Sequence, residues 1–269
     1  MYAPPAGARG GRVDHPSGSK KCVHCLAELT KETRSKDHVF PKQWFPDTTP
    51  QNLNRWTVPA CKKCNGDLGE VENRLLTVLS CCVDPTKPET AGVYQRVRRG
   101  LAIGLTDEER KKLDPRELRA REQAKQELLQ EMRPLDAAGP DEIASLFPGL
   151  GPWHTPQRQF MLTIREQDIR RFSEKMVRGC EFKIAQRLIE PAYSVAVFFV
   201  RENDVTPEIQ KLERLAAAYD LGSAFRVKRI AAHDEPLTVY YWIEFWGIVT
   251  VRATIDCMTL DTGSSKEES

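Results

Sequence analysis

Two cysteine pairs constrain the fold of this chain more than any other feature. Cys22/Cys25 and Cys61/Cys64 each have the C-x-x-C spacing. Two such knuckles can supply four thiolates to one tetrahedral zinc ion, which leaves no open position for a substrate. A chance spacing or a redox motif is the alternative, but no thioredoxin-like βαβ pattern accompanies the pairs. We therefore predict a structural zinc ion that stabilises a short polar unit.

The other cysteines and a nearby histidine are expected to have no part in this zinc site. Cysteine in apolar or helical surroundings usually acts as a small hydrophobic residue, which is the role we assign to Cys81, Cys82, Cys180 and Cys257. His24 lies inside the first knuckle, where four cysteines already complete a tetrahedral site. We therefore expect His24 to be a surface residue.

The insert between the knuckles carries the residues that point to chemistry. It spans residues 26–60, which is longer than the roughly fifteen to twenty residues of a plain four-cysteine ribbon. Inside it lies the hexapeptide Asp37-His38-Val39-Phe40-Pro41-Lys42, and Asn65 directly follows the last cysteine. The insert is therefore expected to hold more than a zinc loop.

These three pieces, C-x-x-C, D-H-x-x-P-K and C-x-x-C-N, together resemble the zinc-containing branch of the HNH endonucleases. Their ββα-metal fold also includes phage Holliday-junction resolvases, and the resemblance covers about residues 20–80. It implies a metal-dependent endonuclease that hydrolyses phosphodiester bonds in nucleic acid, DNA rather than RNA. It also implies that His38 is the general base and that Asp37 and Asn65 bind one catalytic Mg²⁺ or Mn²⁺ ion.

The chemistry of these residues agrees with those roles. Histidine with a pKa near 6.5 is neutral at physiological pH and can accept a proton from water, whereas carboxylate and amide oxygens suit Mg²⁺ or Mn²⁺. For Asn65, a helix N-cap is the competing role. Neighbours on a regular strand point to opposite faces, so Asp37 and His38 must lie at a strand end or irregularity to share a site. Pro41 is consistent with such an end.

The chain departs from the family pattern at one position. Many members carry an asparagine where this chain has Trp56, and Asn52 or Asn54 would have to replace it. Basic residues that could contact phosphates lie around the motif, namely Lys42, Arg55, Lys62 and Lys63. The net charge of +2 is too close to zero to predict a nucleic-acid partner alone.

We predict an α+β fold with a zinc-stapled ββα-metal module, a charged helical linker region and a C-terminal α+β domain with a mostly antiparallel sheet. The N-terminal segment has no apolar core of a signal peptide, and no apolar run approaches the roughly 18 residues that span a bilayer. We therefore expect a cytoplasmic protein that contacts no membrane. The expected boundaries are 1–19 for a disordered lead-in, 20–83 for the module, 84–157 for the linker, 158–258 for the second domain and 259–269 for a disordered tail.

Hydrophobic periodicity predicts the elements within these units. We expect a helix from near Asn65, one charged helix between Thr106 and Pro134, a central strand at 195–200, and a helix that continues through Tyr219 to near Gly222. Strands are expected at 225–231, 237–246 and 248–255, with Gly247 in a turn. The helix face at 169–180 consists of Ile169, Phe172, Met176 and Cys180. Tyr240, Trp242 and Trp246 could stack on bases, but an aromatic face packed under a helix is the preferred interpretation.

Two other readings of function stay open. A non-catalytic zinc module that binds nucleic acid or protein is one alternative, and it is supported by the missing asparagine and the near-neutral charge. An activity that resides in the C-terminal half is the other. A homo-oligomer formed through the charged helix or the C-terminal domain is compatible with either.

Overall fold

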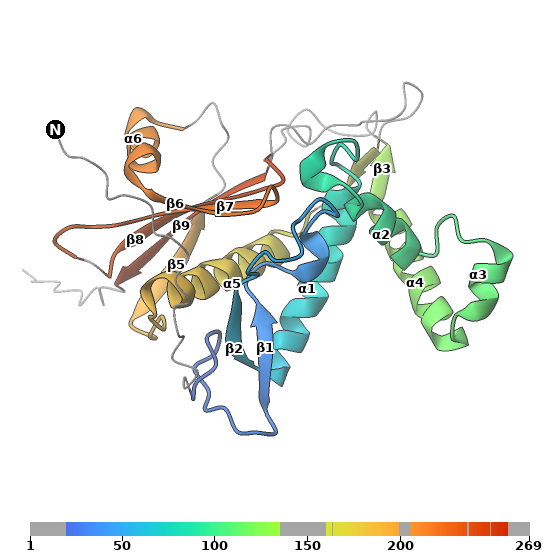
Figure 1. Ribbon diagram of the computed structural model, residues 1–269, viewed down its shortest axis with the longest axis horizontal. Helices are drawn as coiled ribbons and strands as arrows, with labels where there is room; N and C mark the ends of the chain where they lie inside the picture. The colour runs from blue at the N-terminus through green and yellow to red at the C-terminus, as the bar shows by residue number, and fades with distance from the viewer. Residues whose placement is uncertain are drawn as a thin grey trace, which may run out of the picture.

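A computed structural model of the protein describes residues 20–134, 160–162, 164–198, 205–235, 237–247 and 249–257. Helices and antiparallel sheets make up this part of the chain, which confirms the predicted α+β class (Figure 1). The expected lead-in at 1–19, the expected tail at 259–269 and the last part of the expected linker, residues 135–157, lie outside the described residues.

The first unit is a hairpin followed directly by a helix. Strands β1 (Arg34–His38) and β2 (Thr57–Cys61) pair antiparallel and enclose the short helix η1 (Lys42–Trp44). Helix α1 (Lys62–Ser80) begins earlier than predicted, because Cys61 is its N-cap and accepts a hydrogen bond from the Cys64 amide at 3.3 Å. The predicted inner face is confirmed, since Leu68, Val71, Leu75 and Leu79 are buried.

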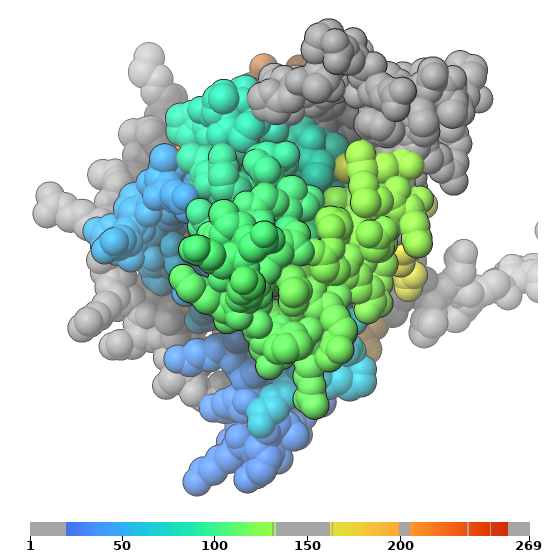
Figure 2. All heavy atoms as spheres, turned by 90° about the vertical axis from the view of Figure 1, so that its right-hand side faces the viewer, coloured from blue at the N-terminus to red at the C-terminus, as the bar shows by residue number. Residues whose placement is uncertain are grey.

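The linker region is helical, but two helices lie between Thr106 and Pro134, where one was predicted. It begins with η2 (Pro88–Thr90) and α2 (Val93–Gly100). Thr106 is the N-cap of α3 (Asp107–Lys112), where the charged helix was expected to begin, and forms a capping box with Glu109. Asp114 then caps a separate helix, α4 (Pro115–Glu131). Proline favours the first turn of a helix and disrupts its interior, which explains the break. Figure 2 shows α2, α3 and α4 together on one face of the molecule.

The predicted end of the charged helix is also displaced. Helix α4 stops at Glu131 because β3 (Met132–Pro134) pairs with β4 (Phe160–Leu162) in a two-stranded sheet. A half-buried ion pair joins two helices of the linker, since Arg110 of α3 pairs with Glu122 of α4 at 2.7 Å. Within α4, Arg121 pairs with Glu117 at 2.6 Å.

The C-terminal part is a five-stranded antiparallel sheet covered by a long helix. Helix α5 (Glu166–Ala185) buries the predicted face of Ile169, Phe172, Met176 and Cys180. The strand order is β5-β9-β8-β7-β6, with every neighbouring pair antiparallel, so the predicted mostly antiparallel sheet is confirmed. The strands are β5 (Tyr193–Phe198), β6 (Ala217–Leu221), β7 (Phe225–Ala231), β8 (Val239–Phe245) and β9 (Val249–Cys257).

Two predictions about this sheet are wrong. The apolar run at 195–200 is not a central strand, because β5 lies at the sheet edge and Phe198 is 45% exposed; residues 199 and 200 lie outside the described part. The helix α6 (Pro207–Leu215) ends before Tyr219, which lies on β6 opposite Val227. Here sheet pairing overrides a helical spacing that only four residues supported.

The turns and the aromatic face of the sheet follow the predictions. Gly247 has a φ of +68° in the turn between β8 and β9, a conformation that glycine adopts without strain. Tyr240 donates a hydrogen bond to Glu213 of α6 at 3.1 Å, and Trp246 is buried. Packing, the preferred interpretation, is therefore confirmed for these aromatic residues.

One continuous hydrophobic core joins the hairpin to the C-terminal sheet. Trp44 of η1 stacks on Trp246 with ring centroids 5.0 Å apart, and the Trp246 indole N–H donates to the Trp44 carbonyl at 2.9 Å. Trp44 also stacks on Phe172 of α5 at 4.6 Å. The proposed division at residues 83 and 158 stays a prediction, but the two parts do not have separate cores within the described residues.

Candidate functional site

Four cysteine sulfurs converge at the start of α1. The Sγ atoms of Cys22, Cys25, Cys61 and Cys64 all lie within 4.8 Å of one another, and the Cys25 and Cys61 sulfurs are 3.9 Å apart. Zinc–sulfur bonds of about 2.3 Å in a tetrahedron place sulfurs about 3.8 Å apart, so the donor set fits zinc. The four cysteines form no disulfide. The predicted cluster is therefore present as a site that could hold a structural metal.

The local sequence explains this convergence. The first knuckle is a tight turn in which the Leu26 amide donates to the Cys22 carbonyl at 2.9 Å. The second knuckle contains the β2–α1 junction, where Cys61 ends the strand and Cys64 lies in the first helical turn. Burial, and then the neighbouring thiols Cys61 and Cys25, raise the pKa of Cys64. A bound metal ion would therefore have to displace a proton from this thiol.

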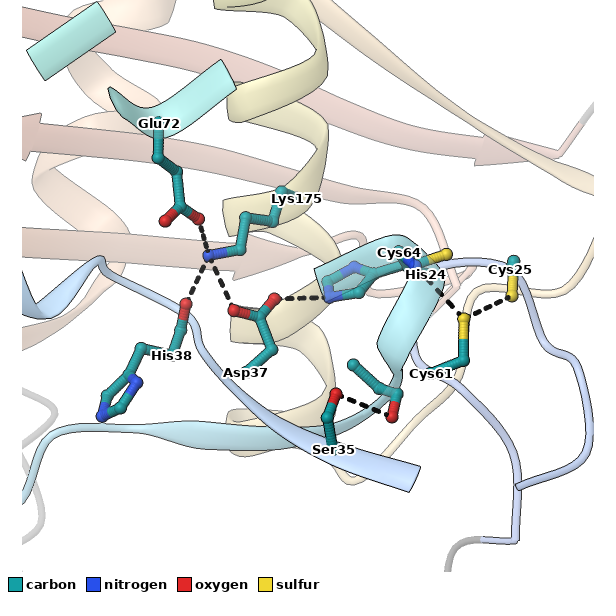
Figure 3. Close-up of polar contacts among 10 residues, drawn as sticks. His24, Cys25, Ser35, Asp37, His38, Cys61, Cys64, Glu72 and Lys175 are labelled. Atoms are coloured by element: carbon teal, nitrogen blue, oxygen red, sulfur yellow. Dashed lines mark hydrogen bonds and ion pairs between the residues drawn. The ribbon is translucent and has the colours of Figure 1, made fainter. Parts of the chain in front are cut away.

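Asp37 is buried behind the first knuckle. Its side chain is on the inner face of β1 and accepts a hydrogen bond from Nε2 of His24 at 2.8 Å (Figure 3). Its other oxygen lies 3.2 Å from Nζ of Lys175 on α5. Burial alone would raise the pKa of Asp37, but the hydrogen bond from His24 and the charge of Lys175 outweigh it and hold that pKa below its usual range.

Lys175 is the centre of this network. Its side chain is 1% exposed, and its ammonium group also contacts Glu72 of α1 and the backbone carbonyl of His38. Figure 3 shows these groups converging on Nζ from β1, α1 and α5. Three oxygen acceptors match the three donors of an ammonium group. We call Asp37, His24, Lys175 and Glu72 the Asp37 network.

Sequence reasoning missed three members of this network. The prediction that His24 is a surface residue is wrong, because its side chain is 6% exposed and bonded to Asp37. Lys175 is a charged residue between Phe172 and Met176 of the apolar face of α5. This interruption of the apolar face is the one feature of the sequence that could have indicated its role. Its pairing with residues more than a hundred positions earlier follows from the packing of α5 on α1.

The imidazole of His38 points away from the Asp37 network (Figure 3). His38 is the last residue of β1 but pairs in regular register with Thr57, so adjacent side chains take opposite faces. The strand irregularity that would let Asp37 and His38 share one site is therefore not observed. Partial burial, together with the charges of Lys175, Arg55 and Lys42, outweighs the charge of Asp37 and lowers the pKa of His38.

The other predicted residues are distributed over both sides of the hairpin. Lys42 and Arg55 are close enough to His38 to influence its pKa, whereas Lys62 and Lys63 are exposed in the first turn of α1, where Lys63 pairs with Asp67 at 2.6 Å. Because Cys61 caps α1, the N-cap role for Asn65 is wrong.

The asparagines near the motif make no contacts that assign them a role. Asn52 and Asn54 are exposed in the loop before β2. Within the described residues, neither they nor Asn65 form a side-chain hydrogen bond with Asp37 or His38. Trp56, which replaces the family asparagine, packs against Tyr219 of β6 with ring centroids 6.1 Å apart. This position therefore joins the hairpin to the sheet.

The observed contacts do not fit the catalytic ion that the resemblance implies. Both oxygens of Asp37 are engaged by His24 and Lys175. The oxygens of Asp37, Glu72 and the His38 carbonyl would suit a hard cation, but the Lys175 ammonium is at their centre. The pairing of Asp37 with Asn65 as ligands of one ion stays a prediction.

Comparisons with protein-family models, curated proteins and solved structures found no match to this chain. Among the helices of the described part, none is long and apolar enough to cross a membrane.

Proposed function

We propose that this chain is an HNH-type endonuclease of ββα-metal architecture that hydrolyses phosphodiester bonds in nucleic acid, DNA rather than RNA. The observation that carries the proposal is the hairpin of β1 and β2 followed directly by α1, around four converging thiols, with Asp37 and His38 at the end of β1. This order of elements supports the proposal.

His38 is proposed as the general base. Its lowered pKa keeps the imidazole neutral at physiological pH, so that it can accept a proton from an attacking water. Lys42 and Arg55, which lie near His38, would attract the phosphate. A bound Mg²⁺ or Mn²⁺ ion would stabilise the departing oxyanion. Binding of that ion by Asp37 requires His24 or Lys175 to release a carboxylate oxygen.

Cleavage of supercoiled plasmid and of RNA tests the proposal. Wild-type protein and the variant His38→Ala are incubated with each substrate, with and without Mg²⁺ or Mn²⁺. We expect nicking of the plasmid by the wild type only, with unchanged zinc content in the variant. If wild-type protein with full zinc content cleaves neither the plasmid nor the RNA, the proposed endonuclease activity is rejected.

A non-catalytic zinc module that binds nucleic acid is the second candidate. The observation that favours it is the closed Asp37 network, in which an ammonium group neutralises the proposed metal ligand. Binding of oligonucleotide without any cleavage, under all metal conditions, would select this candidate. The predicted homo-oligomer stays a prediction that sedimentation of the same protein would test.

A further inference from the structure

A pocket next to the Asp37 network lies between α5 and the four-cysteine cluster with the first turns of α1. It has a volume of about 180 Å³ and is open to solvent. The first turns of α1 form one wall, and one face of α5 forms the other. The space therefore suits a small group such as phosphate better than a whole nucleotide.

The α5 wall of this pocket is rich in cations. Arg171, Lys175 and Arg178 recur at helical spacing and line it together with Glu174. Arg171 is exposed, and Arg178 is half-buried and donates one long hydrogen bond, at 3.4 Å, to the Ile189 carbonyl, which leaves further N–H donors of its guanidinium group for a ligand. Guanidinium groups recognise phosphate through paired N–H donors.

Two acidic residues line the pocket, Asp67 of α1 and Glu174 of α5. Asp67 lines the pocket, but it is paired with Lys63 at 2.6 Å, and Glu174 is the remaining carboxylate. His24 also lines the pocket, and its Nδ1 atom is buried with no hydrogen-bond partner among the described residues. Lys175 is itself paired with Asp37 and Glu72, so around this space two guanidinium groups, those of Arg171 and Arg178, outnumber the single carboxylate of Glu174.

We propose that the pocket between α1 and α5 binds a phosphate group of the nucleic-acid backbone, held mainly by Arg171 and Arg178. The inference rests on the proposed nucleic-acid partner, but not on cleavage. It gives α5, which lies outside the region of family resemblance, a direct part in substrate binding. It also accounts for a basic helix face beside the zinc unit, on the side of the hairpin away from the His38 imidazole.

Binding of a fluorescent oligonucleotide, measured by anisotropy without added Mg²⁺ or Mn²⁺, tests this site. The comparison is made in the His38→Ala background, so that the oligonucleotide stays intact. Arg171→Gln alone and Arg171→Gln/Arg178→Gln are compared with the matched control Arg116→Gln/Arg119→Gln, which changes two exposed arginines of α4. Circular dichroism and zinc content establish that each variant is folded.

We expect the double pocket variant to bind about tenfold more weakly, with a salt-dependence slope lower by about one, since the pocket holds one phosphate and each lost phosphate contact lowers the slope by roughly one. The single variant should bind with an affinity between those of the parent and the double variant, and the control should match the parent. Wild-type affinity and slope in both folded pocket variants would overturn the site.

A parallel titration with inorganic phosphate distinguishes the source of the ligand. Phosphate that competes with the oligonucleotide supports a backbone phosphate in the pocket, whereas arginine-dependent binding of phosphate without oligonucleotide binding would replace the proposal by a free-phosphate site. Because no arm requires catalysis, pocket-dependent binding without cleavage would reject only the endonuclease. Cleavage with pocket-independent binding would reject only this site.

Discussion

The ammonium nitrogen of Lys175 lies 3.2 Å from Oδ1 of Asp37, and this contact joins α5 to strand β1 of the hairpin. Because Lys175 also contacts Glu72, one cation serves two carboxylates in a buried space. Asp37 of the D-H-x-x-P-K motif is therefore bound by a residue of α5, which lies outside the region 20–80 that resembles the HNH endonucleases.

Replacement of Lys175 should destabilise the fold and expose a cation site. In Lys175→Met, Asp37 and Glu72 lose their buried counter-charge, so we expect the free energy of unfolding to fall by about 3–5 kcal/mol. Mn²⁺ should then stabilise the variant more than the wild type, because two carboxylates are left to bind it. Urea unfolding with and without Mn²⁺ measures both effects.

Lys36→Met is the matched control for that experiment, since Lys36 is exposed on the same strand as Asp37. Its unfolding free energy should stay within about 0.5 kcal/mol of the wild type. Equal stability of the Lys175 and Lys36 variants, with no added effect of Mn²⁺, would contradict the network.

Substitution of Gly179 should disturb the end of β1. A Cβ atom at this position of α5 would lie 2.7 Å from Cγ2 of Val39, the residue after His38. Alanine favours helix by about 1 kcal/mol over glycine, but overpacking costs typically ~1–3 kcal/mol. We expect Gly179→Ala to lower the melting temperature, and Val39→Ala in the same chain to restore part of the loss. Additive effects of the two substitutions would contradict direct contact.

Metal content should depend on the four clustered thiols. Cys61→Ser is expected to lose zinc and to unfold the N-terminal unit, whereas Cys257→Ser, an exposed cysteine outside the cluster, should keep one zinc per chain. Since the pKa of Cys64 is raised, zinc competes with protons and its apparent affinity should increase as pH rises. Zinc analysis of purified variants, and chelator titrations between pH 6 and 8, test these statements. Full zinc content in Cys61→Ser would exclude the site.

The contact between α1 and α5 should weaken in acid. Arg74 donates two hydrogen bonds to Asp168, at 2.9 and 3.0 Å, and these bonds lower the pKa of Asp168. A depressed folded pKa contributes stability above the unfolded value of about 3.9, and this contribution is lost as pH falls through the folded pKa. Asp168→Asn should therefore cost about 1 kcal/mol at pH 7, a modest value because Arg74 is solvent-accessible.

The measurement for Asp168 is the difference in unfolding free energy between wild type and variant, followed from pH 7 to pH 3. The difference should shrink below about pH 4. A difference that stays constant, or grows in acid, would show that the ion pair does not stabilise the helix contact.

Local patterns predicted much of the fold. The buried face of α1, the inner face of α5 and the strand alternation of β8 were visible because each repeats a spacing over several turns or residues. The four thiols were predictable because zinc requires a fixed ligand chemistry. By contrast, the helix expected through Tyr219 rested on few apolar residues, and pairing with β7 decided its structure.

The Asp37 network could not be predicted, for a physical reason. Lys175 reaches Asp37 only because α5 packs between the sheet and α1, and such packing is set by contacts distant in sequence. The orientation of His38 was foreseen as a problem, since strand neighbours point apart, but the sequence does not show which face the core takes. Helix α5 completes the burial of Asp37, so the side chain of His38 lies on the opposite face of β1.

The role of His38 as a general base is tested most directly by chemical rescue. Single-turnover cleavage of a labelled DNA duplex is measured for wild type and His38→Ala, with and without free imidazole. We predict that the variant cleaves about 10²- to 10⁴-fold more slowly, that imidazole restores part of the rate, and that zinc content and melting temperature are unchanged. Cleavage by His38→Ala at the wild-type rate would contradict the account.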